Sequence, residues 1–193
     1  AIAEAGCGHM IAADLEDLDS CEGLVRDAVA KLGGLDLIVY AASASRLGLV
    51  RGLTSADWAR LYAINVIGPA IVFRAALDSL APAAICAFIS SESVGMPYHG
   101  LVPYGSSKAA LEELVRGMRV EHPELRFSCI RVGQTMPTDF ARDFDPELAG
   151  ELLPKWIALG RIPAQSMDVE EVGRVIASSL ATAIANPTVE LQD

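Results

Sequence analysis

The sequence is constrained most by short apolar runs that alternate with segments of helical period. Leu35–Ala42 is apolar enough on both faces to be a central strand of a parallel sheet, and Ala84–Ile89 and Arg126–Val132 are similar runs. Apolar residues recur at helical spacing between them, as from Cys21 to Leu32. Strands that alternate with helices predict an α/β fold in three layers, with a doubly wound parallel sheet between helices.

Other elements are expected on either side of these strands. One helix is expected from Thr54 to about Leu80 with a kink at Pro69, and another from Pro103 to about Val120. The rest comprises a helix end at Ala1–Gly6, a buried strand at His9–Leu15, a helix capped by Asp19 and Glu22, a loop region at 133–163 with a short helix at Glu147–Leu159, a last helix from Asp168 to Ala185, and a strand at Thr188–Leu191. No linker or repeat divides the chain, so residues 1–193 are expected to form one domain.

The composition limits the partners of this chain. A net charge of −10 argues against nucleic acid and against an anionic membrane. No apolar run approaches the length that spans a bilayer. The cysteines, Cys7, Cys21, Cys86 and Cys129, lack metal-type spacing, so we expect no metal site, reduced buried thiols and a cytoplasmic protein.

The segment from Ile89 to Leu111 carries the clearest chemistry. Tyr104 and Lys108 are four residues apart, so on a helix they share a face, and Ser91 stands where a strand ends. An ammonium one turn away is expected to lower the pKa of the tyrosine, which then serves as a general acid or base on a C–O–H group. This pattern predicts the interconversion of an alcohol and a carbonyl, for which a hydride carrier is needed.

A Tyr-x-x-x-Lys pair alone also occurs by chance on the solvent-exposed edge of many amphipathic helices. Here the pair follows a strand, two serines and a Gly/Pro turn, and Gly105-Ser106-Ser107 stand between its members. The segment resembles the active-site signature of the short-chain dehydrogenase/reductase family, in which Tyr-x-Ala/Ser-Ser-Lys follows a serine by thirteen residues. Ser91 lies thirteen positions before Tyr104. The resemblance implies a Rossmann-like fold and catalytic roles for Ser91, Tyr104 and Lys108.

The resemblance also implies roles for residues outside this segment. Asn65 is similar to the asparagine that holds a water in the proton relay of the family. Asp14-Leu15 is similar to an Asp-Val pair that touches the adenine ring, although an acid at the start of a helix explains Asp14 equally well. Gly133 fits the glycine of the Pro-Gly pair that the family has after the strand at Arg126, and the threonine that meets the nicotinamide amide is either Thr135 or Thr138.

The sequence departs from the family pattern in two places. Tyr40-Ala41-Ala42-Ser43 stands where the family has Asn-Asn-Ala-Gly, so the asparagine that ties strands together is missing, while Ala41 and Ala42 keep backbone contacts to the cofactor ribose. The family's first β-α-β unit, with its Gly-rich pyrophosphate loop, has no counterpart before Asp14. Either an N-terminal segment is missing from this sequence or the chain is a reduced member with a damaged cofactor site.

These observations predict an oxidoreductase that uses NAD or NADP, with the form left open. Its substrate is expected to be a small alcohol or carbonyl compound. An apolar lid over the pocket would favour a lipophilic one, although the same residues are equally consistent with a core: Phe140, Phe144, Leu148, Leu152, Leu153 and Trp156. The resemblance implies a homodimer or homotetramer. Two alternatives remain, a cofactor-sensing or scaffold protein without turnover, and an epimerase or dehydratase with the same Tyr/Lys pair.

Overall fold

The computed structural model describes residues 8–188 of the chain. Three parallel strands form the main sheet in the order β1-β2-β3, with bounds β1 (Leu35–Tyr40), β2 (Leu80–Ser91) and β3 (Arg126–Val132). A second parallel pair joins the short strands β4 (Thr135–Met136) and β5 (Met167–Asp168).

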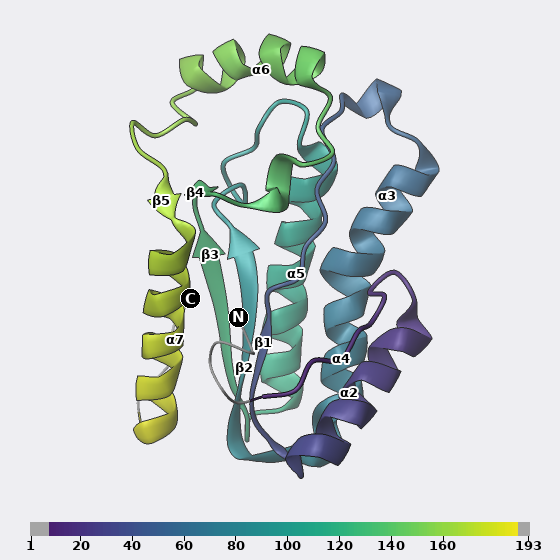
Figure 1. Ribbon diagram of the computed structural model, residues 1–193, viewed down its shortest axis with the longest axis vertical. Helices are drawn as coiled ribbons and strands as arrows, with labels where there is room; N and C mark the ends of the chain where they lie inside the picture. The colour runs from purple at the N-terminus through teal and green to yellow at the C-terminus, as the bar shows by residue number, and fades with distance from the viewer. Residues whose placement is uncertain (1–7, 189–193) are drawn as a thin grey trace.

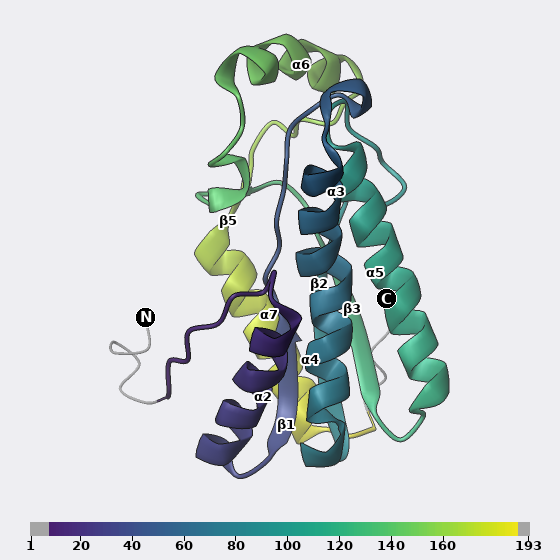
Figure 2. The same cartoon turned by 90° about the vertical axis from the view of Figure 1, so that its right-hand side faces the viewer.

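Helices cover both faces of the main sheet (Figures 1 and 2). One face packs against α2 (Leu18–Leu32), α4 (Gly68–Ala76) and α5 (Val102–Glu121), and the other against α7 (Val169–Ala185). Side chains alternate along β2 to serve the two layers, since Cys86 and Phe88 face the first layer while Ile85 and Ala87 lie under α7. This arrangement confirms the predicted three-layer α/β fold.

The helical run after β1 is not one regular helix. It comprises α3 (Ser55–Tyr62), a π-helical turn η2 (Ala63–Ile67), α4 and a 3₁₀ turn η3 (Leu77–Ser79). Thr54 and Asp57 cap α3 reciprocally, and Pro69 lies at the first turn of α4, where its missing N–H is tolerated. The kink predicted at Pro69 is therefore absorbed by the π turn that precedes it.

The expectation that no run approaches the length of a membrane span was wrong. Ser55–Ser79 has both the length and, at 1.4, the mean hydropathy of such a span. In the structure, however, the run contributes Leu61, Val72 and Phe73 to the buried cores, where they pack against the sheet and its neighbouring helices. Its apolar character is thus explained by the packing of a core helix.

Two predictions at the N-terminal end were also wrong. His9–Leu15 is not a strand, because residues 8–14 are mostly exposed and make no ladder with β1. The cap of α2 is Asp17, whose side chain accepts from the Asp19 amide, in place of Asp19 itself. The helix end predicted at Ala1–Gly6 and most of the strand predicted at Thr188–Leu191 lie outside the described residues.

The predicted loop region at 133–163 contains β4, a 3₁₀ turn η4 (Asp139–Ala141) and α6 (Pro146–Ala158). Asp145 caps α6 by accepting from the Leu148 amide at 2.9 Å. Figure 1 shows α6 lying across the upper end of the molecule, beyond the C-terminal ends of β2 and β3 and beside the start of α5. This edge of the sheet is where the candidate site lies.

Candidate active site

The end of β2 and the first turns of α5 bring together the three residues of the predicted signature. Two turns link the elements, since the Val94 amide donates to the Ser91 carbonyl and the Met96 amide to the Ser93 carbonyl. The chain then returns into α5, where Tyr104 and Lys108 are buried on the face toward β2, as their spacing predicts.

Tyr104 is only 7% exposed, and the hydroxyls of two serines lie close enough to influence the pKa of its side chain. One is the predicted Ser91, and the other is Ser43, which the sequence analysis did not select. Burial raises the pKa of Tyr104, the hydrogen bonds of Ser91 and Ser43 lower it, and the charge of Glu92 raises it. The net effect is a raised pKa, because burial is the largest of these influences.

The expectation that Lys108 lowers the pKa of Tyr104 was therefore wrong for this structure. The Lys108 ammonium donates to the Ile89 carbonyl at 2.8 Å and lies 5.9 Å from the centroid of the Tyr104 ring. Burial lowers the pKa of Lys108 itself to about 8, because its side chain is almost fully enclosed. The lysine thus holds the end of β2 and does not bond the tyrosine oxygen.

Asn65 is fully buried in the π turn η2, and its amide connects three segments. Its Oδ1 accepts from the Ala44 amide at 2.8 Å and from the Ser43 hydroxyl at 3.2 Å, while Nδ2 donates to the Ala44 carbonyl and to Ser107 Oγ, both at 2.9 Å. These four bonds use the hydrogen-bonding capacity of the side-chain amide. A relay water would therefore need the main-chain carbonyl of Asn65, since the side chain has no vacant donor or acceptor.

Tyr40 stands where the family has an asparagine, and it makes a hydrogen bond to a neighbouring segment. Its buried hydroxyl donates to the Ile64 carbonyl at 2.7 Å and so joins β1 to η2. A Cβ on Gly68 would lie 2.7 Å from this hydroxyl, so glycine at that position leaves room for the tyrosine. Tyr40 thus joins β1 to a helical segment, whereas the missing asparagine was expected to tie strands together.

The candidate adenine contacts lie away from this cluster. Asp14 is exposed, its Oδ1 accepts from the Glu16 amide at 2.9 Å and its own amide donates to Ser20 Oγ, as expected for an acid ahead of a helix. Leu15 is half-buried against Leu61 and Ile64.

The backbone candidates for the cofactor ribose come directly after β1. Ala41 is exposed and Ala42 is half-buried at the edge of the main core. Both thus stand at the carboxyl end of a parallel strand, where an open α/β sheet binds its ligands.

The candidate cofactor-binding residues after β3 lie at different distances along the chain from the end of that strand. Gly133 follows β3 directly, and a Cβ there would lie 2.9 Å from Glu92 Oε2, so a larger residue would require that carboxylate to move. Thr135 is half-buried in β4 and its hydroxyl donates to the Gly133 carbonyl at 3.0 Å, whereas Thr138 is exposed and caps η4. Of the two threonines, Thr135 lies next to the glycine of the motif.

The predicted apolar lid lies on Tyr104. The ring of Phe140 meets the Tyr104 ring edge to face, with centroids 5.0 Å apart, and Phe144 packs on Phe140 in the same manner at 5.4 Å. Other members of the cluster come from α6 and the loops: Leu47, Leu101, Leu148, Leu152 and Trp156. Leu153 is 43% exposed on the outer side of α6, so it lies outside the lid.

The residues around Lys108 fit the ribose of a nicotinamide cofactor. An ammonium carries three N–H donors, and the described structure gives Lys108 one acceptor, the Ile89 carbonyl. Two donors thus remain for the vicinal diol of a ribose. Within residues 8–188, no group of His, Cys, Asp or Glu side chains is arranged to hold a metal ion.

Comparisons with known proteins agree with this geometry. A sequence model described as short chain dehydrogenase matches residues 3–149. The chain is 33% identical over 112 residues to the short-chain dehydrogenase/reductase FrzI of Cladobotryum sp, covering 58% of this chain and 43% of that protein. It is 28% identical over 182 residues to Elsinochrome reductase 1 of Elsinoe fawcettii, covering 86% and 67% respectively.

A solved structure shares the fold. It is a blue fluorescent protein from a metagenomic library in complex with NADPH, 26% identical, with a TM-score of 0.70 over 89% of this chain and 66% of that one. The chain therefore spans less than half of one of these three relatives and about two thirds of the other two. Because the family match covers most of the chain and includes Ser91, Tyr104 and Lys108, the protein belongs to the short-chain dehydrogenase family.

Proposed function

We propose that the protein reduces the carbonyl group of a lipophilic compound to an alcohol with NADH or NADPH. The observation that carries this proposal is the buried Tyr104 hydroxyl, which lies within reach of the Ser91 and Ser43 hydroxyls and one helical turn from a buried lysine. Such a constellation presents a proton donor and a second hydroxyl to a single oxygen atom. The NADPH bound by a relative of the same fold supports the choice of cofactor class.

Tyr104 is the proton donor in this proposal. Because its pKa is raised, the side chain is a neutral phenol at pH 7 and has a proton to give. The Ser91 hydroxyl holds the carbonyl oxygen of the substrate next to Tyr104, so that the proton reaches this oxygen as the alcohol forms. A bound nicotinamide would supply the hydride that the carbonyl carbon requires.

Lys108 and Asn65 support this step without contacting the substrate. The two remaining N–H donors of Lys108 would hold the ribose of the cofactor, while its third keeps the end of β2 in place through Ile89. A relay water would be bound by the main-chain carbonyl of Asn65. Pro69, four residues later, has no N–H that could donate a helical hydrogen bond to this carbonyl. The proton lost by Tyr104 would be replaced along this route.

The aromatic lid supports a planar, apolar substrate. Phe140 and Phe144 stack edge to face beside Tyr104, and similar ring contacts would hold an aromatic ketone against the reacting hydroxyl. The relationship to Elsinochrome reductase 1 supports a reductase, without naming the substrate of this chain.

Steady-state oxidation of NADPH and NADH, measured with a fused-ring aromatic ketone and with a small aliphatic ketone, tests this proposal. Phe140→Ala is expected to raise KM for the aromatic ketone by about fivefold, because an aromatic contact contributes roughly 1 kcal/mol beyond its area. KM for the small ketone should change by less than about threefold.

Leu153→Ala is the matched control, since Leu153 lies on the outer side of α6 and should leave both KM values unchanged. An equal loss in the Phe140 and Leu153 variants would contradict the substrate assignment. No ketone-dependent oxidation with either cofactor would contradict the reductase itself.

A further inference from the structure

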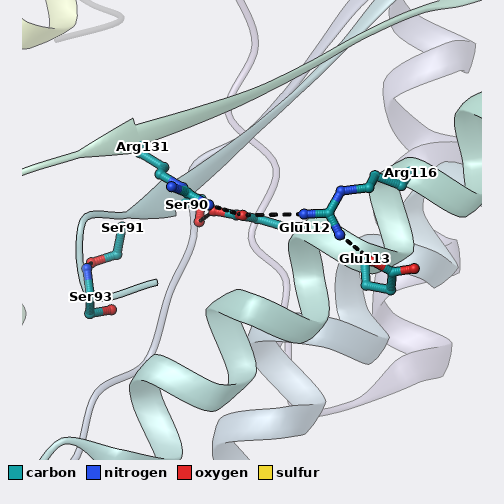
Figure 3. A network of polar contacts seen from close by, with 7 residues as sticks. All are labelled: Ser90, Ser91, Ser93, Glu112, Glu113, Arg116 and Arg131. Atoms are coloured by element: carbon teal, nitrogen blue, oxygen red, sulfur yellow. Dashed lines mark hydrogen bonds and ion pairs between the residues drawn. The ribbon is translucent and has the colours of Figure 1, made fainter. Parts of the chain in front are cut away.

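A buried carboxylate in α5 lies outside the groups that the proposed reaction uses. Glu112 is 6% exposed, and its Oε1 accepts from Ser90 Oγ at 2.7 Å and from Arg131 Nε at 2.7 Å. Its Oε2 accepts from Arg131 Nη2 at 2.6 Å, and Arg116 approaches the same oxygen at 3.9 Å. Figure 3 shows these side chains converging from β2, β3 and α5. One carboxylate thus joins the three elements that build the site.

Glu112 remains ionised in this environment. Burial raises the pKa of its carboxyl group, but the hydrogen bonds of Arg131 and Ser90 and the charges of Arg131 and Arg116 lower it, with a lowered pKa as the result. Hydrogen bonds to a carboxylate are short and strong when the donor is a guanidinium. The pair of bonds from Arg131 therefore fixes the orientation of the carboxylate that receives Ser90.

The position of Glu112 on α5 places it in one row with the signature residues. The members of this row, spaced four residues apart, meet three consecutive residues at the end of β2. Lys108 bonds Ile89, Glu112 bonds Ser90, and Tyr104 lies close enough to Ser91 for the serine to influence its pKa. The bonds of Ile89 and Ser90 set how far β2 reaches along α5. They thereby set the distance between Ser91 and the Tyr104 hydroxyl.

The same carboxylate also fixes the neighbouring strand. Ser90 pairs with Arg131 and Ser91 with Val132 in the sheet register, and the Glu92 amide donates to the Val132 carbonyl at 3.1 Å. Gly133, a candidate for cofactor binding, comes directly after this pairing. A shift of Arg131 would therefore move both the serine and the glycine of the site.

We propose that Glu112 is a positioning residue of the reaction, which acts by holding Ser90 and Arg131 so that Ser91 meets Tyr104. A mere gain in stability explains the arrangement poorly, because a buried ion pair contributes little over apolar packing of the same volume. The Arg131 side chain is 53% exposed and has water as an alternative partner. The inference rests on the proposed reductase function and assigns it a further residue.

The test is Glu112→Gln, which preserves shape but turns the acceptor of the second Arg131 bond into a donor. We expect kcat to fall by about 30-fold, since a misplacement of about 1 Å costs roughly a hundredfold. KM for the reduced cofactor should change much less than kcat, because the variant shifts Gly133 but leaves the proposed contact of Lys108 with the ribose in place. Backbone amide exchange at Glu92 and Ser93, measured by NMR, should become at least about tenfold faster as the end of β2 loosens.

Glu113→Gln is the matched control on the next residue of the same helix. Its side chain is 74% exposed and pairs with Arg116 at the surface, so kcat and amide exchange should match the wild type. If Glu112→Gln does not fold, Ser90→Ala removes one of its bonds alone and should lower kcat about fivefold.

The outcomes separate the inference from the function on which it rests. A folded Glu112→Gln protein whose kcat and amide exchange equal those of Glu113→Gln would overturn the positioning role, as would wild-type values for Ser90→Ala. If the wild-type protein turns over no ketone but Glu112→Gln still exchanges its amides faster, the tie between α5 and β2 is supported and the reductase function is contradicted.

Discussion

Replacing Tyr104 with phenylalanine is expected to lower kcat for ketone reduction by about a thousandfold, because positioned proton transfer contributes roughly 10²–10⁴ in rate. The variant loses the hydroxyl that lies within reach of Ser91 and Ser43 but keeps the ring that packs against Phe140. Steady-state oxidation of the reduced cofactor measures the loss. The dissociation constant of the cofactor should change by less than about threefold.

Tyr62→Phe provides the control for this substitution. Tyr62 is half-buried in α3, and its hydroxyl donates to Ser106 Oγ at 3.1 Å, close to the site but outside the proposed proton path. Its kcat should stay within about threefold of the wild type. A Tyr104→Phe enzyme with a tenth or more of the wild-type kcat would contradict the assignment of Tyr104 as proton donor.

Replacing Lys108 with methionine is expected to weaken cofactor binding and at the same time to stabilise the fold. The variant lacks the ammonium that would bond the ribose, and bonds of this charged type contribute about 1.5–3 kcal/mol, or about 10- to 100-fold in affinity. Fluorescence titration with the reduced cofactor measures this loss. Unchanged affinity would remove Lys108 from the cofactor site.

The gain in stability follows from the burial of the lysine. Its pKa is about 8 in the folded chain against an ordinary 10.5, so holding the charge inside at pH 7 costs about 3 kcal/mol. Losing the charged bond to the Ile89 carbonyl offsets about 2 kcal/mol of this, so the variant should be about 1 kcal/mol more stable toward urea.

The lowered pKa of Lys108 also predicts how the free energy of unfolding changes with pH. Between pH 8 and 10.5 the unfolded chain binds the proton that the folded chain has lost, so wild-type stability gains from Lys108 as pH rises through this window. The methionine variant should lack this gain, whereas Lys31→Met, at an exposed position in the last turn of α2, should retain it. A variant less stable than the wild type at pH 7 would contradict the cost of the buried charge.

The sequence alone predicted the parts of the site that depend on local spacing. Ser91 lies at a strand end and Tyr104 and Lys108 share a face of α5, because helical period and strand length are set by nearby residues. The strand predicted at His9–Leu15 failed because a strand needs a ladder partner, and no spacing within those seven residues reveals whether one is present.

Contacts between distant segments could not be predicted in this way. The lowered pKa expected for Tyr104 depended on where the Lys108 ammonium points, and its bond to Ile89 is set by the depth at which α5 packs on β2. Ser43 joins the site because η2 carries Asn65 against the loop after β1. Glu112 alone offered a signal, as an acid in register with Tyr104 and Lys108 on the helix face toward the sheet.

The most direct test of the central claim is a titration of the full-length protein with NADPH and with NADH, followed by the fluorescence of the reduced nicotinamide. We predict saturable binding of at least one form, retained in Tyr104→Phe and weakened at least about tenfold in Lys108→Met. Absence of binding by a folded protein would contradict the account. The buried cluster of Ser91, Tyr104 and Lys108 would then belong to a scaffold without turnover.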